Sequence, residues 1–250
     1  MAKNNKKIII IPARLAASRL PGKPLAEIGG KPMIQLVWER AIAADLAPVY
    51  VATDDRTIAN VITSAGGKAL MTRTDHPSGS DRIFEAIETI DPDRTISQII
   101  NLQGDLPDLS PDIPHLLVDI LDRGDVDLAT LVTPASEDEA AREQVVKAVV
   151  SWQDKTFGKA IYFSRAAVPT GTNDLWHHIG VYGWRRDALA RFVSLPPSTL
   201  ERAEKLEQLR ALEAGMTIAV GKIAAAPGGV DTAEDLELAR LRATAFQGSD

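Results

Sequence analysis

Residues 8–25 read IIIIPARLAASRLPGKPL and carry the strongest indication of both fold and chemistry in this chain of 250 residues. The run opens with four isoleucines, which is typical of a parallel strand covered on both faces. A loop with three cations follows at once: Arg14, Arg19 and Lys23. Ligands of open α/β sheets bind beyond the carboxyl ends of the strands. The loop is therefore well placed to bind a polyphosphate through bidentate arginines and a mobile lysine.

A solvated surface turn is the simplest alternative for this loop, and we would prefer it for a single arginine. Three cations within ten residues of a buried strand favour phosphate binding instead. The loop is neither a Walker loop nor a dinucleotide-binding fingerprint. Gly29-Gly30-Lys31 lacks the Walker spacing and its Ser or Thr, and indicates a turn before a helix.

Apolar runs alternate with helical patterns over the first half of the chain. We expect strands at 8–12, 49–53, 68–72, 96–102 and 128–133. We expect helices at 32–45, at 55–65 with Thr53 or Asp54 as cap, around 83–87 after a loop at 73–80, and from Ser110-Pro111 to Gly124. This alternation predicts an α/β fold with a mostly parallel central sheet and helices on both of its faces.

The second half is less regular. Its expected elements are an antiparallel hairpin of 145–152 with 160–163, a loop at 168–176, strands at 179–184 and 217–223, and helices at 199–214 and from Thr232, with Asp235 completing a capping box. We see no repeat, linker or low-complexity tract. The simplest prediction is a single domain over 1–250, with an inserted hairpin region at about 145–184.

Composition excludes several classes of function. A net charge of −6 and a pI near 5.3 argue against a general polyanion binder, so we expect no nucleic-acid partner. The absence of cysteine rules out disulfides and thiolate metal sites, and fits a cytoplasmic protein. Pro12, Arg14 and Arg19 interrupt the apolar N-terminal run well before the roughly 18 residues that a membrane span needs. We therefore expect no membrane insertion.

The chain resembles the Kdo cytidylyltransferases, or CMP-Kdo synthetases, where Kdo is 3-deoxy-manno-octulosonate. The resemblance begins with PARLAASRLPGKPL and reaches from residue 8 to about 240. Its further blocks, in family order, are VATDD (51–55), TRTDHPSGSDR (72–82), NLQGDLP (101–107), KAIYFSRAAVP (159–169), HIGVYGWR (178–185), EKLEQLRALEAG (204–215) and GVDTAEDLE (229–237). Each block alone is of modest specificity, whereas the ordered set is highly specific.

The resemblance implies a three-layer, Rossmann-like nucleotidyltransferase fold of the nucleotide-diphospho-sugar transferase type. It also implies a Mg²⁺-dependent reaction in which CTP and Kdo give CMP-Kdo and pyrophosphate, for lipopolysaccharide biosynthesis. A homodimer is implied as well, and we expect its interface in the strands of 159–184. Two alternatives stay open: a related sugar acid, such as 8-amino-Kdo or a nonulosonate, and a catalytically silent nucleotide-binding module. The silent module would have no need for both of the carboxylates described next.

Two aspartates are candidates for the metal. Asp105 follows the strand expected at 96–102, and Asp231 precedes the last helix. Carboxylates at strand ends can meet at one sheet edge, and Mg²⁺ commonly uses one or two carboxylates plus substrate phosphate. Asp231 could also simply cap a helix, but both positions match the family's metal-binding aspartates. The four histidines show no HExxH-type spacing, so we expect no transition-metal site.

The resemblance assigns the remaining site residues. Arg14, Arg19, Lys23 and Asp105 match catalytic positions, and no general base stands out. Ser18, Arg73 and Ser78 match positions near the nucleotide, as Arg14 and Lys23 also do. Six further residues match contacts of the sugar acid: Gln103, Arg165, His178, Tyr182, Glu207 and Gln208. Among these six, Arg165 is suited to pairing with the carboxylate of the sugar acid.

Structural explanations compete with these assignments. Arg73 and Ser78 belong to a polar loop that could be a solvated connection. His178 and Tyr182 could pack on the sheet, although strand periodicity puts both on one face. Glu207 could belong to a solvated helix face with Glu204 and Arg210. In one continuous helix, neighbouring side chains such as Glu207 and Gln208 diverge by about 100°.

Two departures from the family pattern bear on the sugar. Leu106 stands where the family usually has Glu after LQGD, and GWR at 183–185 replaces the usual aromatic segment. Both changes leave room for a modified sugar such as an amino analogue of Kdo.

Overall fold

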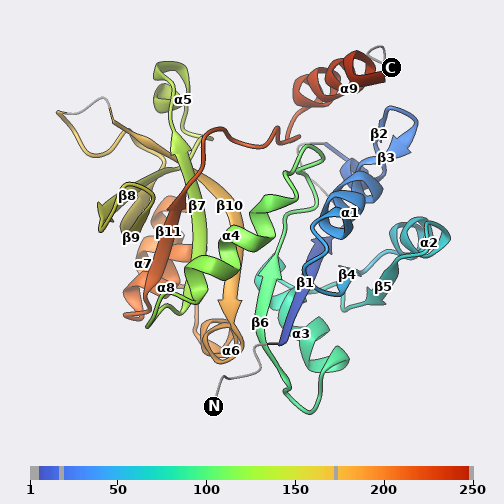
Figure 1. Ribbon diagram of the computed structural model, residues 1–250, viewed down its shortest axis with the longest axis horizontal. Helices are drawn as coiled ribbons and strands as arrows, with labels where there is room; N and C mark the ends of the chain where they lie inside the picture. Colours follow the sequence, from blue (N-terminus) through green and yellow to red (C-terminus); the bar gives the residue numbers. More distant parts are fainter. Residues whose placement is uncertain (1–5, 17–19, 172–173, 248–250) are drawn as a thin grey trace. The chain divides into compact units, whose positions relative to one another are not determined.

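The computed structural model describes residues 6–16, 20–171 and 174–247 (Figure 1). The chain divides into two compact units. Unit 1 contains Met1–Ile96, Asn101–Pro114 and Pro227–Asp250, and unit 2 contains Ser97–Ile100 and His115–Ala226. Both units combine strands with helices, so the predicted α/β class is confirmed. The expectation of a single domain stays a prediction.

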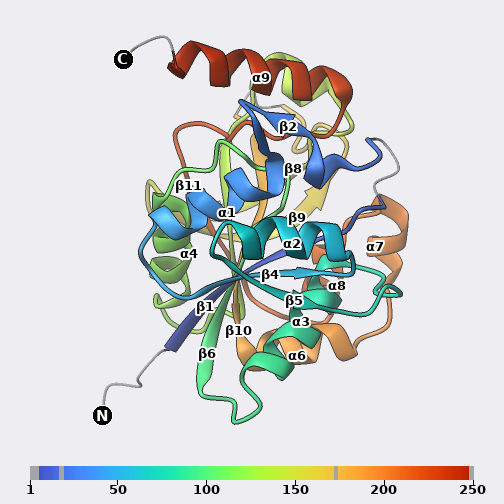
Figure 2. The same cartoon turned by 90° about the vertical axis from the view of Figure 1, so that its right-hand side faces the viewer.

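Unit 1 contains a parallel sheet with the strand order β5-β4-β1. Its strands are β1 (Lys6–Ala13), β4 (Val49–Thr53) and β5 (Lys68–Met71), and its main helices are α1 (Met33–Ala43), α2 (Arg56–Ser64), α3 (Gly79–Ile90) and α9 (Ala233–Gln247). The four isoleucines of β1 are at most 1% exposed, as the uninterrupted apolar run predicts. Figure 2 shows α1 and α2 on one face of these strands and α3 on the other.

The loop after β1 turns into a short 3₁₀ helix, η1 (Lys23–Leu25), and then into a hairpin of β2 (Glu27–Ile28) and β3 (Lys31–Pro32). Gly29 and Gly30 connect these two strands with φ values of 58° and 80°. Two left-handed residues in succession define the tight hairpin turn that glycine favours. The turn expected at Gly29-Gly30-Lys31 is therefore confirmed.

Two helices begin differently from the prediction. Asp55 caps α2, because its carboxylate accepts hydrogen bonds from the main-chain N–H groups of Thr57 and Ile58. The predicted caps, Thr53 and Asp54, were wrong. Helix α3 begins at Gly79, inside the stretch expected as a loop, because Ser78 caps it by accepting from the N–H of Asp81.

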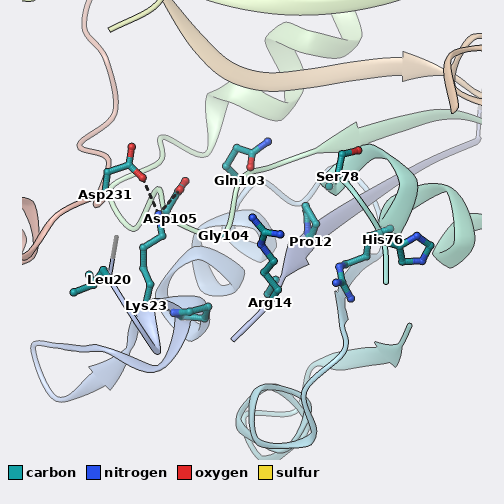
Figure 3. A pocket seen from close by; sticks show the side chains of 14 residues that line it. Pro12, Arg14, Leu20, Lys23, His76, Ser78, Gln103, Gly104, Asp105 and Asp231 are labelled. Atoms are coloured by element: carbon teal, nitrogen blue, oxygen red, sulfur yellow. Dashed lines mark hydrogen bonds and ion pairs between the residues drawn. The ribbon is translucent and has the colours of Figure 1, made fainter. Parts of the chain in front are cut away.

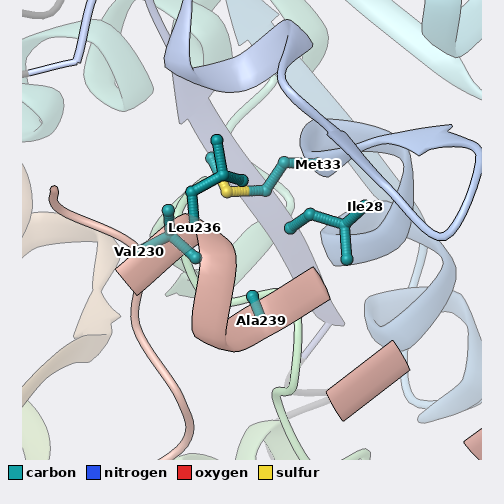
Figure 4. Close-up of a cluster of buried hydrophobic side chains, with 5 residues drawn as sticks. All are labelled: Ile28, Met33, Val230, Leu236 and Ala239. Carbon is teal, nitrogen blue, oxygen red and sulfur yellow. The ribbon is translucent and has the colours of Figure 1, made fainter. Parts of the chain in front are cut away.

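Helix α9 packs on unit 1 through a small apolar cluster (Figure 4). Val230, Leu236 and Ala239 meet Ile28 and Met33 there, and all five are at most 7% exposed. The expected capping box is present, since the N–H of Thr232 donates to Asp235 Oδ2 and the N–H of Asp235 donates to Thr232 Oγ1. The cluster and the cap together fix the segment that contains Asp231.

Unit 2 has the strand order β6-β10-β7-β11-β9-β8. Its strands are β6 (Ile96–Asn101), β7 (Leu128–Pro134), β8 (Lys147–Trp152), β9 (Phe157–Ser164), β10 (Trp176–Arg185) and β11 (Ile218–Lys222). The expected antiparallel hairpin is present as β8 and β9. Antiparallel pairing also joins β10 to β7 and β9 to β11, so it extends beyond the hairpin region that the sequence predicted.

The helices of unit 2 are α4 (Asp112–Leu121), α5 (Glu137–Ala141), α6 (Arg186–Ser194), α7 (Thr199–Glu204) and α8 (Gln208–Glu213). The single helix predicted over 199–214 was wrong, because Lys205 adopts a left-handed conformation (φ 55°, ψ 46°) that ends α7. Sequence analysis also missed α5 and α6. Within the described residues, no helix combines the length and the apolar character needed to cross a membrane.

We expect the Met33→Ala variant to lose about 2–5 kcal/mol of unfolding free energy, because it opens a cavity in a fully buried cluster. Urea denaturation followed by circular dichroism measures this loss. Leu241→Ala on α9 is the matched control, since Leu241 is 66% exposed and its truncation should change stability by no more than about 0.5 kcal/mol. Equal losses in both variants would contradict the packing described here.

Candidate active site

A cavity of about 290 Å³ opens in unit 1 where β1 ends (Figure 3). Its walls come from Pro12 and Ala13 at the end of β1, from the loop and 3₁₀ helix that follow, from the start of α3, and from residues 103–105. Gly104 lets two of these walls approach closely, because a Cβ there would lie 3.1 Å from the carbonyl oxygen of Pro12. The cavity thus lies beside the phosphate-binding loop expected from the sequence.

Lys23 lies between the two predicted metal aspartates in this cavity (Figure 3). Its Nζ donates to Asp105 Oδ2 at 2.7 Å and to Asp231 Oδ1 at 3.0 Å. Burial lowers the pKa of Lys23, but the charge of Asp105 and the hydrogen bonds to both aspartates outweigh it and raise the pKa above 10.5. The ammonium therefore stays charged at neutral pH, and it draws together carboxylates from two distant stretches of sequence.

Main-chain contacts hold the two aspartates at this place. The N–H of Val230 donates to the carbonyl oxygen of Asp105 at 3.0 Å, which joins the two segments directly. The N–H of Asp231 donates to Asp235 Oδ2 at 3.0 Å. Since Val230 is fully buried in the cluster under α9, packing of that helix determines where the Asp231 carboxylate can lie.

A second ion pair secures the same segment from outside. Arg242 Nε on α9 donates to Asp108 Oδ2 at 2.8 Å. Gly228 passes so close to this pair that a Cβ would lie 2.6 Å from Arg242 Nη2 and 2.7 Å from Asp108 Oδ2. Glycine at 228 therefore lets the chain pass the ion pair on its way to Asp231.

The structure brings some of the other residues predicted to bind the nucleotide to the cavity wall, but not all of them. Arg14 and Ser78 line the cavity, and Figure 3 shows the Arg14 side chain extending toward Gln103 and Gly104. Ser78 also caps α3. The structure does not bring Arg73 to the described cavity wall; its guanidinium is 67% exposed and pairs with Asp75. Ser18 and Arg19 lie outside the described residues.

Sequence reasoning missed two basic residues of the cavity wall, His76 and Arg82. Arg82 is 3% exposed and its Nη2 donates to Asp54 at 2.8 Å, so its charge is neutralised within unit 1. His76 Nε2 is hydrogen-bonded to Glu85. Burial raises the pKa of Glu85, but the bonds from His76 and the N–H of Arg73 outweigh it and lower the pKa. The helical periodicity around α3 was the signal that could have placed Arg82 and Glu85.

The donor set fits a magnesium ion. Oxygens of Asp105 and Asp231 lie within 3.0 Å of one nitrogen, and their side chains are 29% and 51% exposed, so a hydrated cation could reach both. Mg²⁺ prefers oxygen ligands and usually combines one or two carboxylates with substrate phosphate and water. In the part of the chain that the structure describes, no three His, Asp or Glu side chains cluster in a way suited to a metal ion.

The predicted sugar-acid residues are divided between the units. Gln103 lines the cavity of unit 1. Unit 2 contains the others: Arg165, His178, Tyr182, Glu207 and Gln208. The rings of His178 and Tyr182 lie 5.7 Å apart, as a shared environment on β10 predicts, even though the register against β7 shifts between Ile179 and Tyr182.

His178 is held as a neutral side chain. Burial, aided by the neighbouring His177, lowers the pKa of His178 to about 3. The hydroxyl of Thr130 donates to the carbonyl oxygens of Ile179 and Val181, so the ring Nε2, 2.9 Å away, donates its hydrogen to Thr130 Oγ1. That leaves Nδ1 of the neutral ring as a hydrogen-bond acceptor.

Glu207 and Gln208 stand at the start of α8, directly after the break that the sequence did not reveal. The nearby charge of Glu207 adds to burial in raising the pKa of Tyr182 far above its usual range. Gln208 is 6% exposed. Arg165 Nε, Nη1 and Nη2 donate to the main-chain carbonyls of Glu204, Glu143 and Lys205. Unit 2 thus contains all five of these residues, and Arg165 is engaged with the main chain.

Known sequences match this chain over nearly its whole length. A family model described as cytidylyltransferase matches residues 8–218. Relatives named 3-deoxy-manno-octulosonate cytidylyltransferase occur in Rhodopseudomonas palustris strain BisB18 and Azorhizobium caulinodans. They are 55% and 54% identical over 94% and 93% of this chain, and the matches cover 96% and 94% of the relatives.

Solved structures give the same result. One of CMP:2-keto-3-deoxy-manno-octonic acid synthetase complexed with CTP is 42% identical, covers 96% of this chain and 99% of its own, and has a TM-score of 0.89. A putative glucose-1-phosphate thymidylyltransferase from Bacillus anthracis is 15% identical, with 95% of both chains covered and a TM-score of 0.66, and it shows the fold alone. The nucleotidyltransferase fold expected from the sequence is confirmed.

We expect His178 to weaken the protein in mild acid. Its pKa is about 3 in the folded state and about 6.5 in an unfolded chain, so across that range the unfolded state binds more protons. The free energy of unfolding therefore falls as the pH drops, by about 2 kcal/mol between pH 7 and pH 5 from this group. Urea melts of His178→Gln should lack this contribution.

The control for this experiment is His115→Gln, because it removes a histidine that is exposed on α4 and not buried as His178 is. Parallel stability profiles of wild type and His178→Gln between pH 7 and pH 5 would contradict a histidine that is buried in its neutral form.

Proposed function

The chain belongs to the 3-deoxy-manno-octulosonate cytidylyltransferase family, and on this premise we propose that it transfers CMP from CTP to the anomeric 2-hydroxyl of Kdo, releasing pyrophosphate. The family expected from the sequence is thereby confirmed. The observation that carries the proposal is the meeting of Lys23, Asp105 and Asp231 in one cavity at the end of β1. A cation and two carboxylates there suit a triphosphate that binds together with a metal ion.

The residues of unit 1 would bind and orient the triphosphate. Arg14 is exposed at the mouth of the cavity and free to form a bidentate contact with phosphate oxygens. Lys23 lies deeper and offers a charged ammonium to the α- and leaving β-phosphates. Arg19 belongs to the same proposal by its place in the motif. Such contacts serve the reaction mainly by positioning and by stabilising charge.

Asp105 and Asp231 would hold Mg²⁺ in this proposal. When bound, the ion would neutralise phosphate charge and favour attack at the α-phosphorus. The two main-chain contacts of Val230 and Asp231 keep the carboxylates from drifting apart when their charges repel. Lys23 offsets the same repulsion from within the cavity.

For the sugar acid, the contacts that the resemblance implies stay a prediction for each residue: Gln103 in unit 1, and Arg165, His178, Tyr182, Glu207 and Gln208 in unit 2. The acceptor at His178 Nδ1 and the charged Glu207 suit hydroxyl groups of the substrate. Leu106, the departure from the family pattern, packs against Gly229, with a distance of 3.5 Å from its Cδ2 to a Cβ built there. This contact gives no reason to prefer a sugar with an added amine over Kdo.

A homodimer in the cytoplasm stays part of this proposal. Its support is the resemblance and Ile161, which is 56% exposed on β9 within the expected interface of 159–184.

Asp105→Asn tests the proposed metal role. We expect turnover of CTP and Kdo to fall at least about 100-fold, since a charge that stabilises the transition state is lost, while CTP still binds detectably. Pyrophosphate release and calorimetry measure the two properties. Asp119→Asn, an exposed carboxylate on α4, should behave as wild type. Wild-type rates in Asp105→Asn would remove Asp105 from the mechanism.

A substrate panel tests the reaction itself. We expect pyrophosphate release from CTP with Kdo, in the presence of Mg²⁺, to exceed release with UTP or with 8-amino-Kdo or a nonulosonate. A preference for another sugar acid would keep the enzyme class and change the substrate. CTP binding without release in any combination would identify a silent nucleotide-binding module.

A further inference from the structure

Glu204 and Arg165 bind each other's main chain in unit 2. The carboxylate of Glu204 accepts the main-chain N–H of Arg165 at 2.9 Å and the hydroxyl of Ser164 at 2.7 Å. In return, Arg165 Nε donates to the carbonyl oxygen of Glu204 at 2.8 Å. Burial raises the pKa of Glu204, but these bonds and the charge of Arg165 outweigh it and lower the pKa, so Glu204 is ionised at neutral pH.

This reciprocal pair lies at the break between α7 and α8. The last carbonyls of a helix lack partners within that helix, and Arg165 supplies donors to two of them, at Glu204 and Lys205. Lys205 adopts the left-handed conformation there, which is unfavourable for a residue other than glycine and persists only when its surroundings enforce it. The pair is the contact that can enforce it.

A buried lysine extends the same network toward β8. Lys147 is fully buried, and its Nζ donates to the carbonyl oxygens of Arg142 and Val145 at 2.9 and 2.6 Å. Arg165 Nη1 donates to the carbonyl oxygen of Glu143, between them, at 3.1 Å. Two basic side chains, Lys147 and Arg165, therefore hold one stretch of main chain, and this stretch anchors the Arg165 guanidinium from its other side.

The break determines the direction of the two residues that follow. Glu207 is the N-cap of α8 and Gln208 is its first residue, and Leu206 is buried between the break and both of them. Had α7 continued to residue 214, both side chains would emerge at other angles around the helix axis. The direction in which the Glu207 and Gln208 side chains leave the main chain thus depends on the conformation of Lys205.

We propose that Glu204 is a positioning residue for the sugar acid, acting through Arg165 and the α7–α8 break to orient Glu207 and Gln208. The inference rests on the proposed function and deepens it. Three of the five N–H groups of Arg165 are donated to main-chain carbonyls, so Arg165 holds the break and has two N–H groups left for the substrate carboxylate.

Glu204→Gln is the first test. We expect KM for Kdo to rise about tenfold while KM for CTP changes less than about twofold, because charge-assisted bonds are lost only beside the sugar residues. Glu213→Gln is the matched control: Glu213 on α8 accepts the N–H of Leu200 on α7, so it also links the two helices but does not touch the break. An unchanged KM for Kdo in Glu204→Gln would overturn the proposal. If Glu204→Gln does not fold, Ser164→Ala removes one of the same bonds more gently.

A double-mutant cycle separates positioning from direct binding. If Arg165 acts only with Glu204, Arg165→Lys should raise KM for Kdo, and the double variant should be no worse than the poorer single variant. If the two residues act independently, the two effects should multiply, and that result would overturn the proposal that Glu204 acts through Arg165.

Amide hydrogen exchange distinguishes failure of this inference from failure of the proposed function. In the absence of any substrate, Glu204→Gln should speed exchange at residues 205–208 at least about tenfold relative to Glu213→Gln. Unchanged exchange there would overturn the inference whatever the enzyme's substrate proves to be. Inactivity of the wild-type protein toward Kdo, together with faster exchange in the variant, would overturn only the function.

Discussion

The site depends on one ammonium group placed between two carboxylates. Lys23 meets Asp105 across 82 positions of sequence and Asp231 across 208. Without a cation between them, two carboxylates this close would repel each other and favour an open arrangement. The loop after β1, the segment at 103–105 and the chain before α9 therefore meet at this electrostatic contact, and main-chain hydrogen bonds and the apolar cluster under α9 support it.

Around that contact, the protein fixes functional residues through main-chain hydrogen bonds. The N–H of Val230 binds the carbonyl of Asp105, and Asp235 receives the N–H of Asp231. In unit 2, Glu204 and Arg165 use the same principle at a helix break. Main-chain groups have few degrees of freedom, so such bonds restrict position more firmly than contacts between two long side chains. The positions of functional side chains are thus restricted even where the residue does not belong to a helix or strand.

The local charge of the cavity wall differs from the net charge of the chain. The chain has a formal charge of −6, yet Arg14, Lys23, His76 and Arg82 line one cavity. Arg82 is already paired with Asp54, whereas Arg14 is exposed. The cavity therefore combines a neutralised structural arginine with cations available to a ligand. This combination suits the binding of one polyphosphate.

The sequence alone determined the family, the α/β class, the buried first strand and the hairpin of β8 and β9, and it singled out Lys23, Asp105 and Asp231. Each of these depends on local pattern or on an ordered set of motifs. Tertiary structure alone decided the rest. Arg165, 40 positions away, donates to the carbonyl oxygen of Lys205 at the break between α7 and α8, and Asp54 serves as a partner of Arg82 rather than as a helix cap. No local pattern reveals either feature, since the donors and acceptors that decide them come from elements far apart in the sequence and meet only in the folded chain.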